Sequence, residues 1–137
     1  MEFIVDTNIL FSILLKDGSN AHLLFHPKLV LYSPSYALEE LSKYKELIIK
    51  KTERSDEEIE WLLKLLNRLI IFVDEEEYAE FSAEAKKICP DPEDDAFFAL
   101  ALKLRCGIWS NDKELKKQSR IDIYDSKEVA DWLKWYA

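Results

Sequence analysis

The sequence predicts an α/β fold in which a parallel sheet carries helices on both faces. Short runs of strand-forming apolar residues alternate with helical stretches along the 137 residues, an order typical of parallel sheets. The runs are continuously apolar, as in strands that are buried on both faces. The first run, residues 3–5, ends at Asp6, and open α/β sheets bind ligands at the carboxyl ends of their strands. The five expected strands are residues 3–5, 29–33, 70–74, 108–110 and 121–124.

Capping residues and helix-breaking residues predict where the helices between these strands begin and end. Ser55 and Glu58 have the spacing of a capping box, which starts a helix whose apolar residues, Trp61 among them, are expected in the interior. Gly107 is expected to end the strongly apolar helix before it. The expected helices are residues 8–15, a short one ending at 26 after a break at 17–20, 35–52, 55–69, 76–88, 95–106, a short polar one to about 119, and a terminal one capped by Ser126.

The composition narrows the class of protein. The chain has the size of a single domain, residues 1–137, and 48% hydrophobic residues can form a sizeable core. A net charge of −8 argues against a basic protein that coats nucleic acids, but a metal-dependent nuclease stays open because bound cations invert the local field. Two cysteines make no disulfide framework, and two glycines leave no room for a glycine-rich phosphate loop. Without a secretory signal or an apolar run of about 18 residues, we expect a soluble, cytoplasmic protein.

Asp6 and Glu40 are the first candidate site residues. Asp6 either caps the following helix, as aspartate often does, or acts as a ligand at the end of a central strand. A buried carboxylate there has to be hydrogen-bonded, paired or bound to a metal. On the helix 35–52, Glu40 lies at the edge of the buried face, whereas Glu39 lies on the solvent side and can pair with Lys43. Glu40 is therefore placed to reach a site, with a purely structural boundary position as the alternative.

Four acids crowd the start of the apolar helix 95–106. Asp94 and Asp95 stand at its amino end, and Asp91 and Glu93 come just before them. A helix end needs one acidic cap, and like charges packed together raise one another's pKa unless a cation intervenes. The excess of acids therefore indicates a metal site, with capping as the alternative.

Ser110 and Asp112 follow the fourth expected strand. Alone, they are explained as a turn residue and a helix cap. In a parallel sheet, however, the ends of the first and fourth strands lie at the same edge. Asp6, Asp95 and Asp112, with Glu40 from a helix, then converge in one crevice. Oxygen ligands without His or Cys favour magnesium or manganese over zinc.

Together these residues resemble the PIN-domain family of nucleases. The matching segments are residues 5–8 (Val-Asp-Thr-Asn), 37–41, 94–97 and 110–112, which follow the family's order and spacing across essentially the whole chain. The resemblance implies a PIN-like, Rossmann-like three-layer α/β/α sandwich with a five-stranded parallel sheet. It also implies hydrolysis of phosphodiester bonds, commonly in RNA, with Mg²⁺ or Mn²⁺ and with 5′-phosphate and 3′-hydroxyl products.

Many small members of this family resemble VapC-like toxins of toxin–antitoxin pairs and form homodimers. The resemblance therefore implies an RNA substrate, an antitoxin partner and a homodimer, with no membrane association. Asp95 is preferred over Asp94 because the helical segment follows it directly, and Asn111 stands where many members carry a small residue. The residues that carry over are the catalytic and metal-binding acids Asp6, Glu40, Asp95 and Asp112, the supporting Asn8 and Ser110, and Asp91 as an additional outer acid.

Two other interpretations remain open. Asp6 as the nucleophile of a phosphatase is one, but haloacid-dehalogenase-type phosphatases usually carry a second Asp where this chain has Asn8. A non-catalytic RNA- or protein-binding module is the other. In the nuclease interpretation Asp6 is the central ligand, and Glu40 binds the metal through water or holds the attacking water. The lysines considered for attracting the RNA backbone are Lys16, Lys43, Lys113, Lys116 and Lys117.

Overall fold

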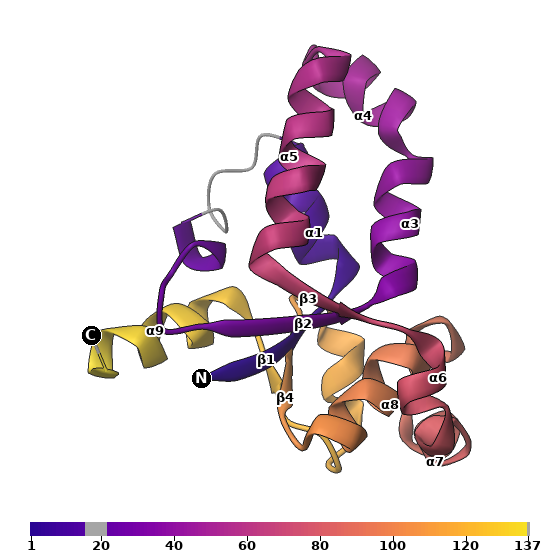
Figure 1. Cartoon of the computed structure of the whole chain (residues 1–137). Coiled ribbons are helices and arrows are strands. Elements are labelled where there is room, and N and C mark those ends of the chain that lie inside the picture. Colours follow the sequence, from indigo (N-terminus) through magenta and orange to yellow (C-terminus); the bar gives the residue numbers. More distant parts are fainter. Residues whose placement is uncertain (16–21, 137) are drawn as a thin grey trace.

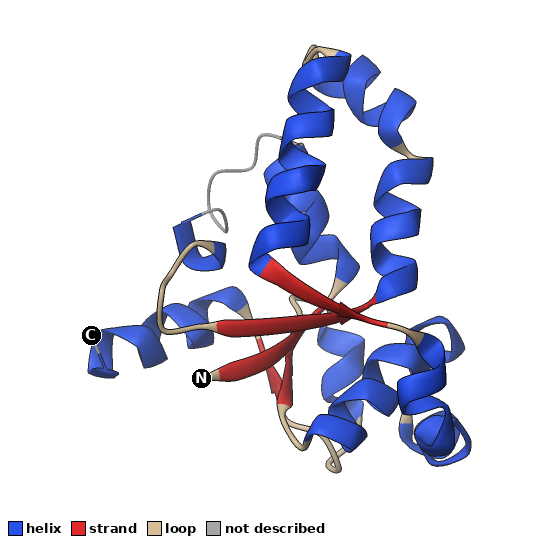
Figure 2. Cartoon of the chain, in the orientation of Figure 1, coloured by secondary structure: helices blue, strands red, loops and turns tan. Residues whose placement is uncertain are grey.

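The computed structural model describes residues 1–15 and 22–136, and the strands in this part of the chain form a five-stranded sheet (Figures 1 and 2). The strands are β1 (Glu2–Val5), β2 (Val30–Pro34), β3 (Ile70–Val73), β4 (Gly107–Trp109) and β5 (Ile123–Tyr124). They lie in the order β3-β2-β1-β4-β5, and every neighbouring pair is parallel. The predicted parallel α/β sheet is therefore confirmed, with β1 at its centre.

Helices on both sides of the sheet give the expected three layers (Figure 1). On one side lie α1 (Thr7–Leu14), α3 (Ser35–Lys43), α4 (Lys45–Thr52) and α5 (Asp56–Leu69). On the other lie α6 (Glu75–Tyr78), α7 (Ser82–Ile88) and α8 (Asp95–Leu104), while α9 (Ser126–Tyr136) packs beside β5. Short 3-10 helices, η1 (Ala79–Phe81), η2 (Pro92–Asp94) and η3 (Lys113–Lys117), occupy connections between these elements.

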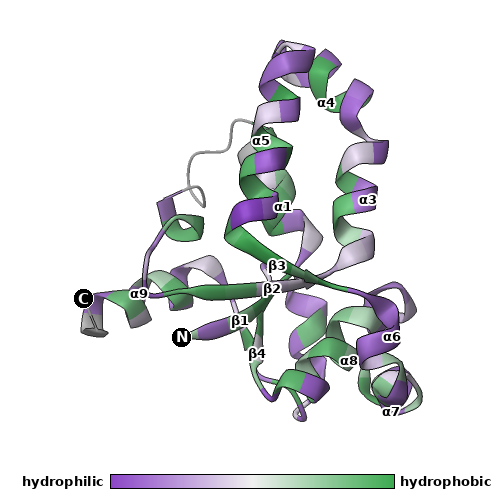
Figure 3. Cartoon of the chain, viewed as in Figure 1, coloured by the Kyte–Doolittle hydropathy of each residue, from purple (hydrophilic) through white to green (hydrophobic). Residues whose placement is uncertain are grey.

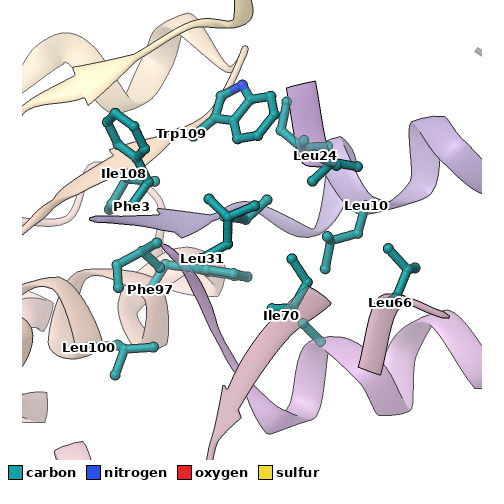
Figure 4. Packing of buried hydrophobic residues seen from close by; sticks show 14 of the residues in the cluster. Phe3, Leu10, Leu24, Leu31, Leu66, Ile70, Phe97, Leu100, Ile108 and Trp109 are labelled. Atoms are coloured by element: carbon teal, nitrogen blue, oxygen red, sulfur yellow. The ribbon is translucent and has the colours of Figure 1, made fainter. Parts of the chain in front are cut away.

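The hydrophobic core fills the space on both faces of the sheet (Figures 3 and 4). Ile4 and Ile108, on the central strands, are fully buried. Leu100 approaches the sheet from α8, and Leu66 approaches from α5 on the opposite face. The strands and α8 are hydrophobic along most of their length, whereas the outer helices alternate between polar and apolar faces. This double coverage explains why the strands read as continuous apolar runs.

Two expected helices are interrupted in the structure. The helix predicted over 35–52 breaks at Tyr44, whose ring packs against Phe11, and a new helix continues with Ile48 buried. The segment 76–88 is divided at Tyr78, a buried residue that leaves α-helical geometry. At Tyr78 the burial of the side chain accompanies the break, whereas Tyr44 is exposed and its break has no packing explanation.

Helix α8 ends earlier than the glycine in the sequence suggests. Arg105, with a φ of 56°, takes the left-handed conformation that closes the helix, and its N–H bonds the carbonyl of Ala101. Gly107 lies instead in β4, where a Cβ atom would stand 2.7 Å from the ring of Tyr124. The glycine is therefore required by a close approach between neighbouring strands rather than by the end of the helix.

Of two helix caps that the sequence predicts, one is present in the structure and the other is not. The predicted capping box of Ser55 and Glu58 is present at the start of α5. Ser126 does not cap α9, because Asp125 Oδ1 accepts the N–H of Glu128 at 2.8 Å and the Glu128 carboxylate accepts the N–H of Asp125 at 3.3 Å. A capping box one residue earlier therefore leaves the Ser126 hydroxyl available for other contacts.

The side chain of Trp61 is 62% exposed, whereas the helical pattern predicts it in the interior. Helix α5 buries Leu62 and Leu66, as expected, together with Ile59 and Leu63. The predicted break at 17–20 and Lys16 lie outside the described residues. Within the described ranges, no helix is both long enough and apolar enough to cross a membrane.

Candidate acidic site at the carboxyl edge of the sheet

Asp6 lies directly after β1, where the chain turns from the central strand into α1. It is 6% exposed, and Ser110 Oγ donates a hydrogen bond of 2.6 Å to Asp6 Oδ2. These residues meet although they are 104 positions apart, because Val5 and Trp109 pair in neighbouring parallel strands. Burial raises the pKa of Asp6, the bond from Ser110 opposes that rise, and the charge of Asp112 adds to it. No regular side-chain capping hydrogen bond joins Asp6 to α1, but the backbone N–H groups of Asn8 and Thr7 at the start of α1 lower its pKa.

Asp94 stands among the charges of the other acids. Burial raises the pKa of Asp94, and the charges of Asp6, Asp91 and Asp112 raise it further, to about 7. Asp94 directly precedes α8 but makes no side-chain capping hydrogen bond there. Its carboxylate is therefore not committed to the helix end and can act as a metal ligand.

Asp95 lies in different surroundings. It lines a separate pocket with Glu39, Glu75 and Tyr78, and its charge raises the pKa of Tyr78 after burial and Glu75. Of the two neighbouring acids, Asp94 is the one whose pKa the charges of Asp6 and Asp112 raise, and the choice of Asp95 as the ligand stays a prediction. The two acids differ because η2 extends the helical turn back before α8, and neighbouring residues of a helix point about 100° apart.

Asp112 caps a short helix and also lies close enough to the other acids for its charge to affect them. Its Oδ1 accepts the N–H of Glu114 at 3.0 Å, which caps η3, and its own N–H donates to Ser110 Oγ at 3.1 Å. Its charge nevertheless raises the pKa of both Asp6 and Asp94. Ser110 thus joins Asp112 to the buried Asp6, and capping uses one of the two Asp112 carboxylate oxygens.

Glu40 and the acids Asp94 and Asp6 have one neighbour in common, Tyr36. Glu40 is partly buried on α3 while Glu39 is exposed, as the helical pattern predicted. Burial raises the pKa of the Tyr36 hydroxyl, and the charges of Glu40, Asp94 and Asp6 raise it further. Sequence reasoning missed Tyr36, although its position four residues before Glu40 puts both on one helix face.

The two remaining predicted residues lie at the margin of the site. Asn8 is exposed, and its backbone N–H, like that of Thr7, lowers the pKa of Asp6. Asp91 Oδ1 accepts the N–H of Glu93 at 3.0 Å, so it caps η2, and its charge raises the pKa of Asp94. Asp91 is therefore a neighbouring acid, and Asn8 contributes through its backbone.

Asn111 has a structural contact that its sequence position did not suggest. Its Oδ1 accepts the N–H of Ser126 at 2.8 Å, and its Nδ2 donates to Ser126 Oγ at 3.1 Å. The same hydroxyl accepts the indole N–H of Trp109 at 3.0 Å. These three bonds fasten the loop after β4 to the start of α9, and they hold Ser110 and Asp112 in place.

The acids fit a hard divalent cation by their chemistry. In the described part of the chain, no three His, Cys, Asp or Glu side chains stand close enough together to hold an ion as they are. Carboxylates that raise one another's pKa repel each other, and a divalent ion removes that repulsion as it draws them together. An all-oxygen set of Asp6, Glu40, Asp94 and Asp112 suits Mg²⁺ or Mn²⁺.

Fold and site thus define a class: an α/β protein with several neighbouring acids at the carboxyl edge of a parallel sheet. The family model described as PIN domain matches residues 4–124, so the chain belongs to the PIN-domain family. PIN-domain proteins are generally nucleases, and they generally use divalent metal ions.

A solved structure shows the same fold. It is described as the crystal structure of VapBC2 from Rickettsia felis bound to a DNA fragment from their promoter. The TM-score is 0.66 at 18% sequence identity, and the match covers 91% of this chain and 98% of the other. Comparison with curated proteins gives no match.

Proposed function

We propose that this protein is a metal-dependent ribonuclease that hydrolyses RNA phosphodiester bonds with Mg²⁺ or Mn²⁺. The observation that carries the proposal is the placement of Asp94 among the charges of Asp6 and Asp112, where its pKa reaches about 7. Membership of a family of nucleases supports the reaction class. The all-oxygen set of donors supports the choice of metal.

In this proposal each acid has a distinct position. A bound divalent ion lowers the pKa of a water and stabilises charge on the scissile phosphate. Asp6, oriented by Ser110, is the central ligand, and Asp94 and Asp112 complete the set from η2 and the loop after β4. Glu40 would help to hold the ion or the attacking water, whose proton it could accept.

A pair of neighbouring variants tests the assignment. Asp94→Asn should lower the rate of cleavage of single-stranded RNA at least about 100-fold in Mg²⁺ or Mn²⁺, because a ligand charge is lost. Asp95→Asn, the matched control, should keep most of the activity. If both variants lose equal activity, the structure-based preference for Asp94 over Asp95 as the ligand is contradicted. Full activity of Asp6→Asn, with the protein folded, would contradict the nuclease mechanism altogether.

We further propose that the chain acts in the cytoplasm as the toxin of a toxin–antitoxin pair, with an antitoxin protein as partner and as a homodimer. The support is the fold shared with the VapBC2 structure. Exposed apolar side chains on the projecting helices, Leu47 of α4 and Trp61 of α5, offer surface for association. Light scattering should give twice the mass of 16.2 kDa, and one chain mass would contradict the dimer.

A further inference from the structure

A second pocket adjoins the acidic site on the side of β4 and β5. It has a volume of about 510 Å³ and is lined by Ser110, Asp112 and Asp125 together with Lys113, Lys116 and Lys127. We call it the lysine pocket. Because Ser110 and Asp112 also belong to the acidic site, a polymer bound in one continues directly into the other.

Two of the three lysines are available to bind an anion. Lys116 is neutralised by Glu128 at 2.6 Å and by Asp125 at 3.9 Å. Lys113 and Lys127 are exposed and take part in none of the ion pairs formed within residues 1–15 and 22–136. In a chain of net charge −8, they place two lysines without an ion-pair partner among the described residues beside Asp112.

The pocket on the other side of the acids has the opposite character. Its acidic lining comprises Glu39, Glu75, Glu93 and Asp95, against the single basic side chain of Lys86. A chain of phosphates is repelled by such a surface and attracted by free ammonium groups. The electrostatics therefore direct a nucleic-acid backbone to the lysine pocket.

The frame of the lysine pocket is held in place by hydrogen bonds. The bonds of Asn111 to Ser126 join the two loops that form its walls. They also occupy the N–H of Ser126, and Asp125 occupies the N–H of Glu128. These two N–H groups at the start of α9 are thus already bonded, whereas the exposed ammonium groups of Lys113 and Lys127 can donate to a ligand.

We propose that the lysine pocket binds a phosphate of single-stranded RNA next to the phosphate that is cleaved, through the ammonium groups of Lys113 and Lys127. The proposal rests on the proposed ribonuclease function and names how the substrate is held. Lysines contact the phosphate as point charges, so this contact should position the strand without selecting its sequence.

Binding in the absence of cleavage tests the proposal. In an Asp94→Asn background with EDTA, a labelled single-stranded oligoribonucleotide is titrated by fluorescence anisotropy at several salt concentrations. Lys113→Gln/Lys127→Gln should lower the slope of log affinity against log salt by about 1.4, because each single-strand contact contributes about 0.7. The same relation gives a loss of about tenfold in affinity near 0.15 M salt. Lys113→Arg/Lys127→Arg should retain binding.

Matched controls separate a local contact from net charge. Lys64→Gln/Lys87→Gln removes two exposed lysines on α5 and α7 and should leave the affinity unchanged. An equal loss in this control, an unchanged slope in the test variant, or absence of RNA binding would overturn the proposal. So would binding of an acidic peptide that depends on these lysines when RNA binding does not. Lysine-dependent RNA binding without cleavage by the unmodified protein would uphold the pocket and reject the ribonuclease function.

Discussion

Asp94 makes the stability of the protein depend on pH. The pKa of Asp94 rises from an ordinary value of 3.8 to about 7 in the folded state. Between these values the folded protein retains a proton that the unfolded chain has lost, so stability falls as pH rises through this window. Because the carboxyl is only half-buried, solvent screening reduces the expected loss to about 1–2 kcal/mol.

Thermal unfolding in EDTA from about pH 4 to about pH 8 measures this effect. The melting temperature of the unmodified protein should fall as pH rises, and Asp94→Asn should flatten that fall and be the more stable form above pH 7. Asp95→Asn should keep the slope of the unmodified protein. Parallel curves for all three proteins would show that Asp94 is not the carboxyl that resists ionisation.

For single residues, the sequence predicted the site residues that follow strands better than those that begin a helix. The sequence could predict that Asp6, Ser110 and Asp112 lie close together, because neighbouring parallel strands end at the same edge of the sheet. Asp94 and Asp95 could not be distinguished, since moving the start of a helix by one residue rotates the ligand by about 100°. Tyr36 gave no separate signal, because a tyrosine on a helix is more often packed in the core.

At the scale of elements, the end of α8 carries avoidable strain. Arg105 holds a positive φ of 56°, which non-glycine residues adopt at a cost of about 1 kcal/mol. Arg105→Gly should therefore raise the free energy of unfolding by about 0.5 kcal/mol, after allowance for the greater freedom of glycine in the unfolded chain. Denaturant titration measures the change. Lys103→Gly, inside the same helix, should instead destabilise by about 1 kcal/mol.

Element types were predictable where the local pattern and the tertiary packing agreed. The five strands and the capping box at Ser55 follow from residues near one another in the chain. The break at Tyr78 coincides with the burial of its ring, which the local pattern does not contain. The exposure of Trp61 has the same origin, since an apolar stripe does not specify whether a helix has a covering partner.

For the whole molecule, the proposed metal site predicts a coupling between metal binding and folding. A divalent ion that binds only the folded chain stabilises it by about 2.7 kcal/mol at a concentration of about 100 times its Kd. Mg²⁺ or Mn²⁺ should therefore raise the melting temperature of the unmodified protein, and the rise should largely disappear in Asp94→Asn. An equal rise in both proteins would place the ion elsewhere. Calorimetric titration of the ion measures the same coupling without unfolding.

The central position of β1 has a consequence for biosynthesis. Asp6 leaves the ribosome long before Ser110, its hydrogen-bond donor 104 residues further on. Until β4 has emerged, β1 can pair with β2 alone and keeps one open edge, the kind of edge that favours aggregation. A nascent chain therefore cannot assemble its acidic centre, and shorter amino-terminal fragments lack it at any concentration.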